Sequence, residues 1–356
     1  MQPDLTLIWP GVEIGVEKGI LMDKLNRLFV AVGIPYKPGE AQVDEAGLRR
    51  LLRYFLQPKF VNAGGAILIN PEAGEVFYLT REEKRRNVEI AVEECKGKVP
   101  LVAGVIAPTT AESITVARDA KAAGVDGIFL IPPIGAMDVT TSWDAERYPE
   151  VWIDMAKEIC DAVDLPALTH PVTTNSPAYG NGLPVGPTMQ MCQTIPQIVG
   201  WKMTYNYSGF RIIARALRQL QRPVSIMAAT AVYFHEYLAT GCFDGTVTGS
   251  FNYAMEPMID HIEAWRRGDA KGALEIWNSG LSELHEYVYS EYSRLHVRYK
   301  AACWLRGLID EPLMRPPQPK PRLEELRRLR GLLQQTGLSV ISESALERFS
   351  HAPASV

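Results

Sequence analysis

The sequence predicts an α/β protein built as a single (β/α)8 TIM barrel with additional C-terminal helices. Eight short apolar runs alternate with segments of helical periodicity, a pattern typical of a parallel barrel. No Gly-x-Gly-x-x-Gly motif follows the first run, so a doubly wound open sheet is the weaker alternative. The chain has 356 residues and is 47% hydrophobic, so it can bury one core of the size that such a barrel requires.

Each expected strand is an apolar run that is bounded by turn residues or ended by a polar side chain. Apolar residues at helical spacing fill the intervals, and the helix that opens at Thr80 has a capping-box pattern with Glu83. The expected strands are residues 28–32, 65–69, 100–105, 126–131, 165–170, 197–202, 223–228 and 244–248. The expected helices are residues 44–56, 80–95, 110–123, 144–163, 186–194, 208–220 and 255–267, with a shorter one that ends near residue 240.

The barrel is expected to occupy residues 27–268, and purely helical periodicity continues over residues 269–338. Residues 1–26 are an N-terminal extension of mixed character, to which the pattern assigns no role. Residues 339–356 form a small, polar tail that we expect to fray. The segment 171–185 is rich in Thr, Asn, Gly and Pro, and is either a lid over the barrel mouth or only a long connection.

Composition excludes several classes of function. The net charge is only −4, and the Arg-rich segment 322–330 also contains Glu324 and Glu325, so we expect a solvated helix face and no nucleic-acid partner. No apolar run reaches about 18 residues, so no membrane partner is expected. The N-terminus lacks the pattern of a signal peptide. The five cysteines are scattered without a Cys-x-x-Cys pair, which predicts neither a disulfide framework nor structural zinc and favours a reducing, cytoplasmic setting.

The sixth expected strand ends in a lysine, in the sequence Ile198-Val199-Gly200-Trp201-Lys202. An ammonium group at the end of a buried strand is costly unless it is paired or neutralised. Desolvation lowers the pKa of a lysine and leaves more free amine, which is the nucleophile that forms a Schiff base with a carbonyl compound. The alternative is a strand-end lysine that reaches out to water.

His170 ends the neighbouring fifth strand, at the barrel end where catalytic residues lie. Side chains alternate across a strand, so an inward Lys202 implies that Gly200 and Ile198 also point inward and that Trp201 faces the helices. Adjacent strands lie about 4.8 Å apart, so His170 and Lys202 can share one pocket, where a histidine suits proton transfer. The alternative for His170 is a histidine satisfied by a backbone carbonyl. The remaining histidines lie on expected helices or in the tail and are interpreted as structural: His235, His261, His285, His296 and His351.

The second strand ends in Asn70, and the loop Pro71-Glu72-Ala73-Gly74-Glu75 follows it at the same end of the barrel. We expect Glu75 to hold this loop by bonding backbone N–H groups. The pattern leaves open whether Glu72 faces the pocket or the solvent.

Several segments, in this order and at this spacing, resemble the dihydrodipicolinate synthase and N-acetylneuraminate lyase family of class I, Schiff-base aldolases. The resemblance covers about residues 29–338. Residues 199–202 are similar to the family strand that carries the Schiff-base lysine. The other similar segments are Gly74-Glu75 with residues 79–83, residues 99–105, residues 123–127 and residues 244–249.

The chain departs from the family pattern at the positions that recognise substrate and move protons. The two family threonines that hold the carboxylate of pyruvate fall at Glu72 and Ala73, and the family tyrosine at the end of strand five falls at His170. An arginine of the synthases falls at Asn175, and a second tyrosine, expected near residues 133–134, is missing. These changes leave pyruvate or another 2-oxo acid unsupported as the substrate.

The resemblance implies a lysine-dependent lyase in which Lys202 forms an imine with a small carbonyl substrate and His170 shuttles the proton. Asn70, Glu72, Ala73 and Thr204 are expected to contact the substrate, and Gly74 and Glu75 to support the site. No cofactor and no metal are required, because the imine itself withdraws electrons. Homo-oligomers, often tetramers, are implied. Two alternatives remain: a Schiff-base dehydratase or hydratase, and a barrel that has lost catalysis and serves as a binding or regulatory protein.

Overall fold

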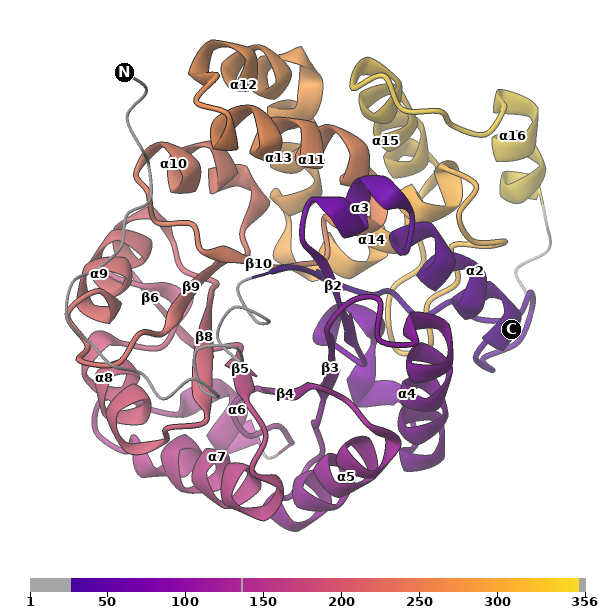
Figure 1. Ribbon diagram of the computed structural model, residues 1–356. Helices are drawn as coiled ribbons and strands as arrows, with labels where there is room; N and C mark the ends of the chain where they lie inside the picture. Colours follow the sequence, from indigo (N-terminus) through magenta and orange to yellow (C-terminus); the bar gives the residue numbers. More distant parts are fainter. Residues whose placement is uncertain (1–26, 136, 352–356) are drawn as a thin grey trace.

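The computed structural model describes residues 27–135 and 137–351, and the N-terminal extension at 1–26 lies outside this range. Eight parallel strands close into a barrel in the order β1-β10-β9-β8-β5-β4-β3-β2, which confirms the predicted fold (Figure 1). The barrel strands are β1 (Leu28–Ala31), β2 (Gly65–Ile69), β3 (Leu101–Gly104), β4 (Gly127–Leu130), β5 (Ala167–Thr169), β8 (Ile198–Met203), β9 (Ser225–Ala228) and β10 (Gly245–Thr248).

Helices follow the strands and form the outer ring of the barrel (Figure 1). They are α2 (Glu45–Phe55), α3 (Pro58–Asn62), α4 (Arg81–Cys95), α5 (Thr110–Ala123), α6 (Met137–Ser142), α7 (Glu150–Val163), α8 (Val185–Thr194), α9 (Tyr207–Leu217), α10 (Phe234–Ala239) and α11 (Phe251–Arg266). Short 3-10 turns precede α4 and α10: η1 (Glu72–Gly74), η2 (Val76–Tyr78) and η3 (Ala231–Tyr233).

The start of α4 confirms the predicted capping box, and the start of α7 corrects another expectation. Thr80 accepts the N–H of Glu83, while the Glu83 carboxylate accepts the N–H of Thr80. The helix expected from Asp144 begins only at Glu150. Asp144 instead accepts the backbone N–H groups of the two residues that follow Ala145, which forms a turn that competes with a helix.

The hydrophobic core has two layers, one inside the barrel and one between the strands and the helices. Trp201 packs in the outer layer, as predicted, with its ring 6.1 Å from that of Trp152. Ile198 also lies in the outer layer and Val199 in the inner one, which corrects the expected inward position of Ile198. The register between β5 and β8 shifts at this point, so the strict alternation starts only beyond the irregularity.

The remaining helices pack on one side of the barrel, beside α2, α3 and α11 (Figure 1). They are α12 (Ala270–Ile276), the π-helical segment η4 (Trp277–Leu281), α13 (Ser282–Tyr289), the 3-10 turn η5 (Tyr292–Arg294), α14 (Leu295–Leu305), α15 (Leu323–Gln335) and α16 (Glu343–His351). The tail that we expected to fray thus contains α16, because Leu346 is fully buried and anchors it. Within the described ranges no helix is both long and apolar enough to cross a membrane.

The segment between β5 and α8 forms a small antiparallel hairpin, β6 (Val172–Ser176) and β7 (Gly180–Gly182). The N–H of Leu183 donates to the carbonyl of Pro171, which closes the base of the hairpin. Asn175, Gly180 and Asn181 from this hairpin line a cavity at the barrel mouth. The hairpin therefore forms part of the wall of this cavity and is more than a connection.

Candidate active site

Lys202 lies on β8 and points into a cavity of about 280 Å³ at the C-terminal end of the barrel. Its amine lies 5.6 Å from the centre of the Phe129 ring, which belongs to the apolar interior below. Burial disfavours the ammonium form and lowers the pKa of Lys202 to about 8, although the charge of Glu72 acts in the opposite direction. A larger share of free amine is therefore present near neutral pH than in an ordinary lysine.

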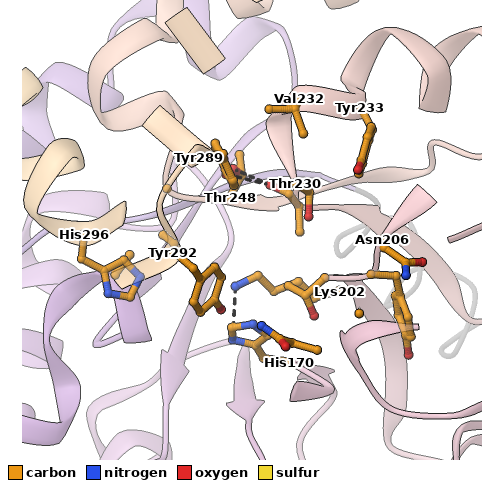
Figure 2. A pocket seen from close by; sticks show the side chains of 18 of the residues that line it. His170, Lys202, Asn206, Thr230, Val232, Tyr233, Thr248, Tyr289, Tyr292 and His296 are labelled. Atoms are coloured by element: carbon orange, nitrogen blue, oxygen red, sulfur yellow. Dashed lines mark hydrogen bonds between the residues drawn. The ribbon is translucent and has the colours of Figure 1, made fainter. Parts of the chain in front are cut away.

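His170 follows directly after β5, and its side chain is almost completely buried beside Lys202. Nδ1 of His170 lies 3.2 Å from Nζ of Lys202, so the two strand ends meet as the sequence predicts (Figure 2). Burial lowers the pKa of His170 to about 4, with Lys202 adding to the shift and Glu72 opposing it. The imidazole is therefore neutral at pH 7.

Glu72 turns toward His170 and not out to the solvent, although it is not among the residues that line the cavity. Its Oε2 lies 3.0 Å from Nδ1 of His170, and its side chain is 20% exposed. Burial by itself would raise the pKa of Glu72, but His170, His296 and Lys202 outweigh this effect and hold the pKa well below the usual value. Glu72 is therefore a carboxylate at neutral pH.

One ring nitrogen of His170 thus lies within hydrogen-bonding distance of both Lys202 and Glu72. A neutral imidazole carries one N–H, which Nδ1 can donate to the Glu72 carboxylate. When the proton is on Nε2 instead, Nδ1 can accept a hydrogen bond from the ammonium of Lys202. The other nitrogen, Nε2, is buried without a partner among the described residues. Nδ1 is therefore the atom through which a proton can move to or from Lys202.

Glu75 and Gly74 support the site from below, in the positions where we expected structural residues. The buried Glu75 carboxylate pairs with Lys300 of α14 and accepts the backbone N–H of Arg315 at 2.9 Å. A Cβ atom at Gly74 would lie 2.8 Å from the carbonyl oxygen of Val32, so only glycine fits there without a shift of the backbone. These contacts fix the loop that carries Glu72.

Asn70 does not line the cavity, which corrects its expected role in substrate binding. Its side chain is fully buried and donates to the carbonyl oxygen of Lys84 at 2.8 Å, while it accepts from Asn87 at 3.1 Å. Both polar atoms of the amide are thereby used to hold the end of β2 against α4. The backbone of Asn70 also has a left-handed φ of 53°, which turns the chain toward the Glu72 loop.

Ala73 and Thr204, which we expect to contact the substrate, both line the cavity. The backbone N–H of Thr204 bonds to the carbonyl of Lys202, which keeps the threonine close to the end of β8. Oγ1 of Thr204 is buried and has no hydrogen-bond partner among the described residues. This hydroxyl therefore has an unused hydrogen-bonding capacity beside the cavity.

The C-terminal helices contribute residues to the site that the sequence pattern did not indicate. Tyr289, Tyr292, His296 and Tyr299 all line the cavity, so His296 lies at the site and is not merely structural as we expected. Figure 2 shows Tyr292 and His296 on one side of Lys202 and Asn206 on the other. The four residues recur at a helical spacing in the sequence, which is the signal that could have identified them, although they belong to α13, η5 and α14.

A hydrogen-bond network fixes part of this wall. The hydroxyl of Tyr299 donates to that of Tyr289 at 2.6 Å, and Tyr289 donates to the carbonyl oxygen of Ala229 at 3.1 Å. The Tyr289 hydroxyl also lies 3.2 Å from Oγ of Ser250. The network connects α13 and α14 to the ends of β9 and β10. The wall is therefore held in place by the barrel, whereas Tyr292 is 55% exposed at the cavity entrance.

Comparison with known proteins agrees with this geometry. The 4-hydroxy-tetrahydrodipicolinate synthase of Methanopyrus kandleri is 27% identical over 316 residues, which cover 88% of this chain and 97% of the relative. An uncharacterized DapA-like lyase of Thermofilum pendens is 25% identical over 277 residues, which cover 77% of this chain and 86% of the relative.

Solved structures share the fold. The dihydrodipicolinate synthase of Aquifex aeolicus superposes with a TM-score of 0.73 at 24% identity, covering 89% of this chain and 99% of that structure. YagE, a prophage protein of E. coli K12 solved in complex with pyruvate, superposes with a TM-score of 0.73 at 20% identity. The match covers 88% of this chain and 99% of that structure. The family model of the Dihydrodipicolinate synthetase family matches residues 24–336. The chain therefore belongs to the Dihydrodipicolinate synthetase family and is an enzyme of its aldolase-type lyase class.

Proposed function

We propose that the chain is a Schiff-base lyase in which the amine of Lys202 attacks the carbonyl carbon of a small substrate. The observation that carries this proposal is the amine of Lys202 in a cavity, 3.2 Å from Nδ1 of His170. Addition of the amine gives a carbinolamine, which loses one water molecule to form an imine. Lysine with a pKa of about 8 has enough free amine for this attack near neutral pH.

His170 moves the protons that these steps require. Loss of water from the carbinolamine needs a proton on the leaving hydroxyl, and cleavage of a β-hydroxy compound needs a proton removed from the β-hydroxyl. Nδ1 of His170 is adjacent to the nitrogen at which the imine forms, and the Glu72 carboxylate contacts the same ring nitrogen and orients the ring. A neutral imidazole can accept the proton that the attacking amine releases and then donate it to the hydroxyl group that leaves as water.

The protonated imine provides the driving force for bond cleavage. The electron pair of the breaking C–C bond moves into the C=N⁺ group and gives an enamine and a released carbonyl compound. Protonation of the enamine carbon and hydrolysis of the imine then regenerate Lys202. The substrate need not be pyruvate, because Glu72 occupies the loop beside His170. Product analysis distinguishes this C–C cleavage from the dehydration that a C–O lyase catalyses.

Borohydride trapping tests the proposal, because hydride reduces the imine to a stable secondary amine on the reacting lysine. Intact mass spectrometry with a panel of aldehydes and ketones should show one adduct, and peptide mapping should place it on Lys202. Lys202→Ala should abolish the adduct. Lys271→Ala is the matched control, because the Lys271 side chain is 90% exposed on α12. A wild-type protein without an adduct across the panel, or an adduct that persists in Lys202→Ala, would refute the proposal.

We also propose that the enzyme works in the cytoplasm as a homo-oligomer, as the family resemblance implies. Its five cysteines are unpaired thiols, which supports a reducing compartment. Sedimentation velocity over a range of protein concentrations tests the assembly, and a single monomeric species at all concentrations would contradict it.

A further inference from the structure

Resting on the proposed function, we infer that the carbonyl substrate has no carboxylate next to its carbonyl group and instead presents hydroxyl groups to the cavity wall. Three observations carry the inference: the Glu72 carboxylate beside the reacting nitrogen, a cavity lining without a second cationic side chain, and an unpartnered hydroxyl at Thr204. The substrate class is thus a neutral hydroxyaldehyde or hydroxyketone.

The first observation concerns charge at the reacting atom. The two contacts of His170 Nδ1, at 3.0 Å to Glu72 and 3.2 Å to Lys202, keep the Glu72 carboxylate within about 6 Å of Nζ. In a 2-oxo acid the carboxylate carbon is bonded directly to the carbon that forms the imine. Such a substrate would hold a second carboxylate close to that of Glu72 in a mostly buried site, where like charges repel strongly.

The second observation is the absence of a counter-charge for that carboxylate. Among the described residues that line the cavity, Lys202 is the only lysine, and no arginine is present. Lys202 becomes the protonated imine, whose single positive charge already interacts with the Glu72 carboxylate. Burial lowers the pKa of both lining histidines, His170 and His296, so neither supplies a full positive charge at neutral pH. The nearby Lys300 is already paired with Glu75.

Two backbone N–H groups of the Glu72 loop are already bonded as well. The N–H of Gly74 donates to the carbonyl of Pro71, and the N–H of Glu75 donates to the carbonyl of Glu72. Both groups are therefore used within the 3-10 turn and do not point at a ligand. A substrate carboxylate would lose its hydration shell without gaining a second cationic partner, whereas a neutral hydroxymethyl group loses much less on burial.

The third observation is the neutral polar lining. Oγ1 of Thr204 is buried without a partner and lies two residues beyond Lys202 in the chain. The amides of Asn175 and Asn181 face the same cavity from the hairpin, and one hydrogen bond of 2.8 Å joins them. A hydroxyl group both donates and accepts hydrogen bonds, so it can satisfy a threonine hydroxyl and an amide in turn. A carboxylate can only accept.

A matched set of three-carbon probes tests the inference. Hydroxyacetone and pyruvate differ only in whether a hydroxymethyl group or a carboxylate is next to the ketone, and acetone has neither. Trapping with borohydride is followed by intact mass spectrometry as a function of probe concentration. We expect half-maximal labelling of Lys202 by hydroxyacetone at a concentration at least about tenfold lower than by pyruvate. We also expect hydroxyacetone to label at a lower concentration than acetone.

Two variants separate the effect of the Glu72 charge from that of the Thr204 hydroxyl. Glu72→Gln removes the charge and should improve labelling by pyruvate relative to hydroxyacetone. Thr204→Val removes one hydroxyl at constant shape, and should weaken labelling by hydroxyacetone while labelling by acetone is unchanged. Thr115→Val on the outer helix α5 is the matched control for the second variant and should change neither ratio. Circular dichroism establishes that each variant is folded before the ratios are compared.

The outcomes distinguish this inference from the proposed function. No adduct on Lys202 with any probe would refute the proposed function itself. Labelling by pyruvate at the same or lower concentration than hydroxyacetone would leave the imine chemistry in place and overturn the substrate class. Unchanged ratios in both Glu72→Gln and Thr204→Val would likewise overturn it.

Discussion

The amine of Lys202 and the imidazole of His170 face each other where β8 and β5 end, with 3.2 Å between Nζ and Nδ1. The two strands are neighbours in the barrel although their last residues are far apart in the chain. Closing the barrel therefore brings a nucleophile and a proton carrier together and buries both. The lowered pKa of each group is a consequence of this burial.

The pH dependence of labelling should report the pKa of Lys202. Only the free amine attacks a carbonyl group, so the rate of imine formation should rise through pH 8 and level off above it. An ordinary lysine would continue to gain amine up to about pH 10.4. The measurement is the initial rate of reductive labelling against pH at fixed probe concentration. A rate that is still rising steeply above pH 9.5 would contradict a buried nucleophile with a pKa of about 8.

Removing the charge of Glu72 should shift this profile to lower pH. Glu72 raises the pKa of Lys202, because its negative charge stabilises the ammonium form. Glu72→Gln should therefore lower the pKa of Lys202 below its wild-type value and allow labelling at more acidic pH. Glu158→Gln on the exposed face of α7 is the control, since it should leave the profile unchanged. A shift to higher pH in Glu72→Gln would show that Glu72 does not act on Lys202 in this way.

Replacing His170 should slow turnover more than imine formation. In His170→Asn the amine of Lys202 remains, so borohydride should still trap an adduct when the probe is in excess. Proton transfer to the leaving groups is lost, so kcat should fall by roughly 10²–10⁴-fold. His296→Asn is the comparison, because His296 lines the same cavity without a hydrogen bond to Lys202. Equal losses of kcat in the two variants would argue against a specific role for His170.

The buried pair of Glu75 and Lys300 should matter for stability. Burial lowers the pKa of Lys300 and Glu75 counteracts this effect, so Glu75→Gln should leave a poorly compensated ammonium. We expect the free energy of unfolding to fall by about 3–5 kcal/mol. Denaturant titration should also show that the variant regains stability as the pH rises toward the ordinary pKa of lysine. Lys300 in the folded state is then a neutral amine, which is less costly to bury than an ammonium.

A second substitution provides the control for this pair. Glu75→Gln combined with Lys300→Met removes both charges and should recover a large part of the lost stability. If the double variant is no more stable than Glu75→Gln, the lost free energy of unfolding came from a change in the conformation of the Glu75 loop and not from the unpaired charge. Exposed Glu82 offers a neutral comparison in Glu82→Gln on the same helix-loop unit.

A methyl group at the end of β3 should disturb the active-site loop from behind. A Cβ atom at Gly104 would lie 1.9 Å from the carbonyl oxygen of Asn70, so Gly104→Ala must move the backbone just before Glu72. We expect a lower melting temperature and weaker labelling of Lys202. Gly186→Ala is the matched control, because nothing lies within 4 Å of its Cβ position in α8. That change should stabilise the protein by about 0.4–1 kcal/mol.

Several elements of the fold follow from local signals. Residues 65–69 form β2 and residues 110–123 form α5 with the predicted bounds, because their periodicity and their flanking turn residues agree. The capping box at Thr80 is equally local. The irregularity in β8 that turns Ile198 outward is different, since it depends on the register with β5. Local alternation contains no information about such a shift.

In the candidate site, too, some features follow from the sequence pattern and others depend on tertiary packing. The sequence by itself determined the barrel and the meeting of Lys202 with His170, because consecutive βα units place strand ends at one face and neighbouring strands in contact. Only the tertiary structure decided that Glu72 turns toward His170, that the Asn70 side chain hydrogen-bonds to α4, and that His296 lines the cavity. The physical reason is that these outcomes depend on packing between segments that are distant in the chain. The helices that follow the eighth βα unit could pack on the barrel in more than one way with the same local hydrophobic pattern.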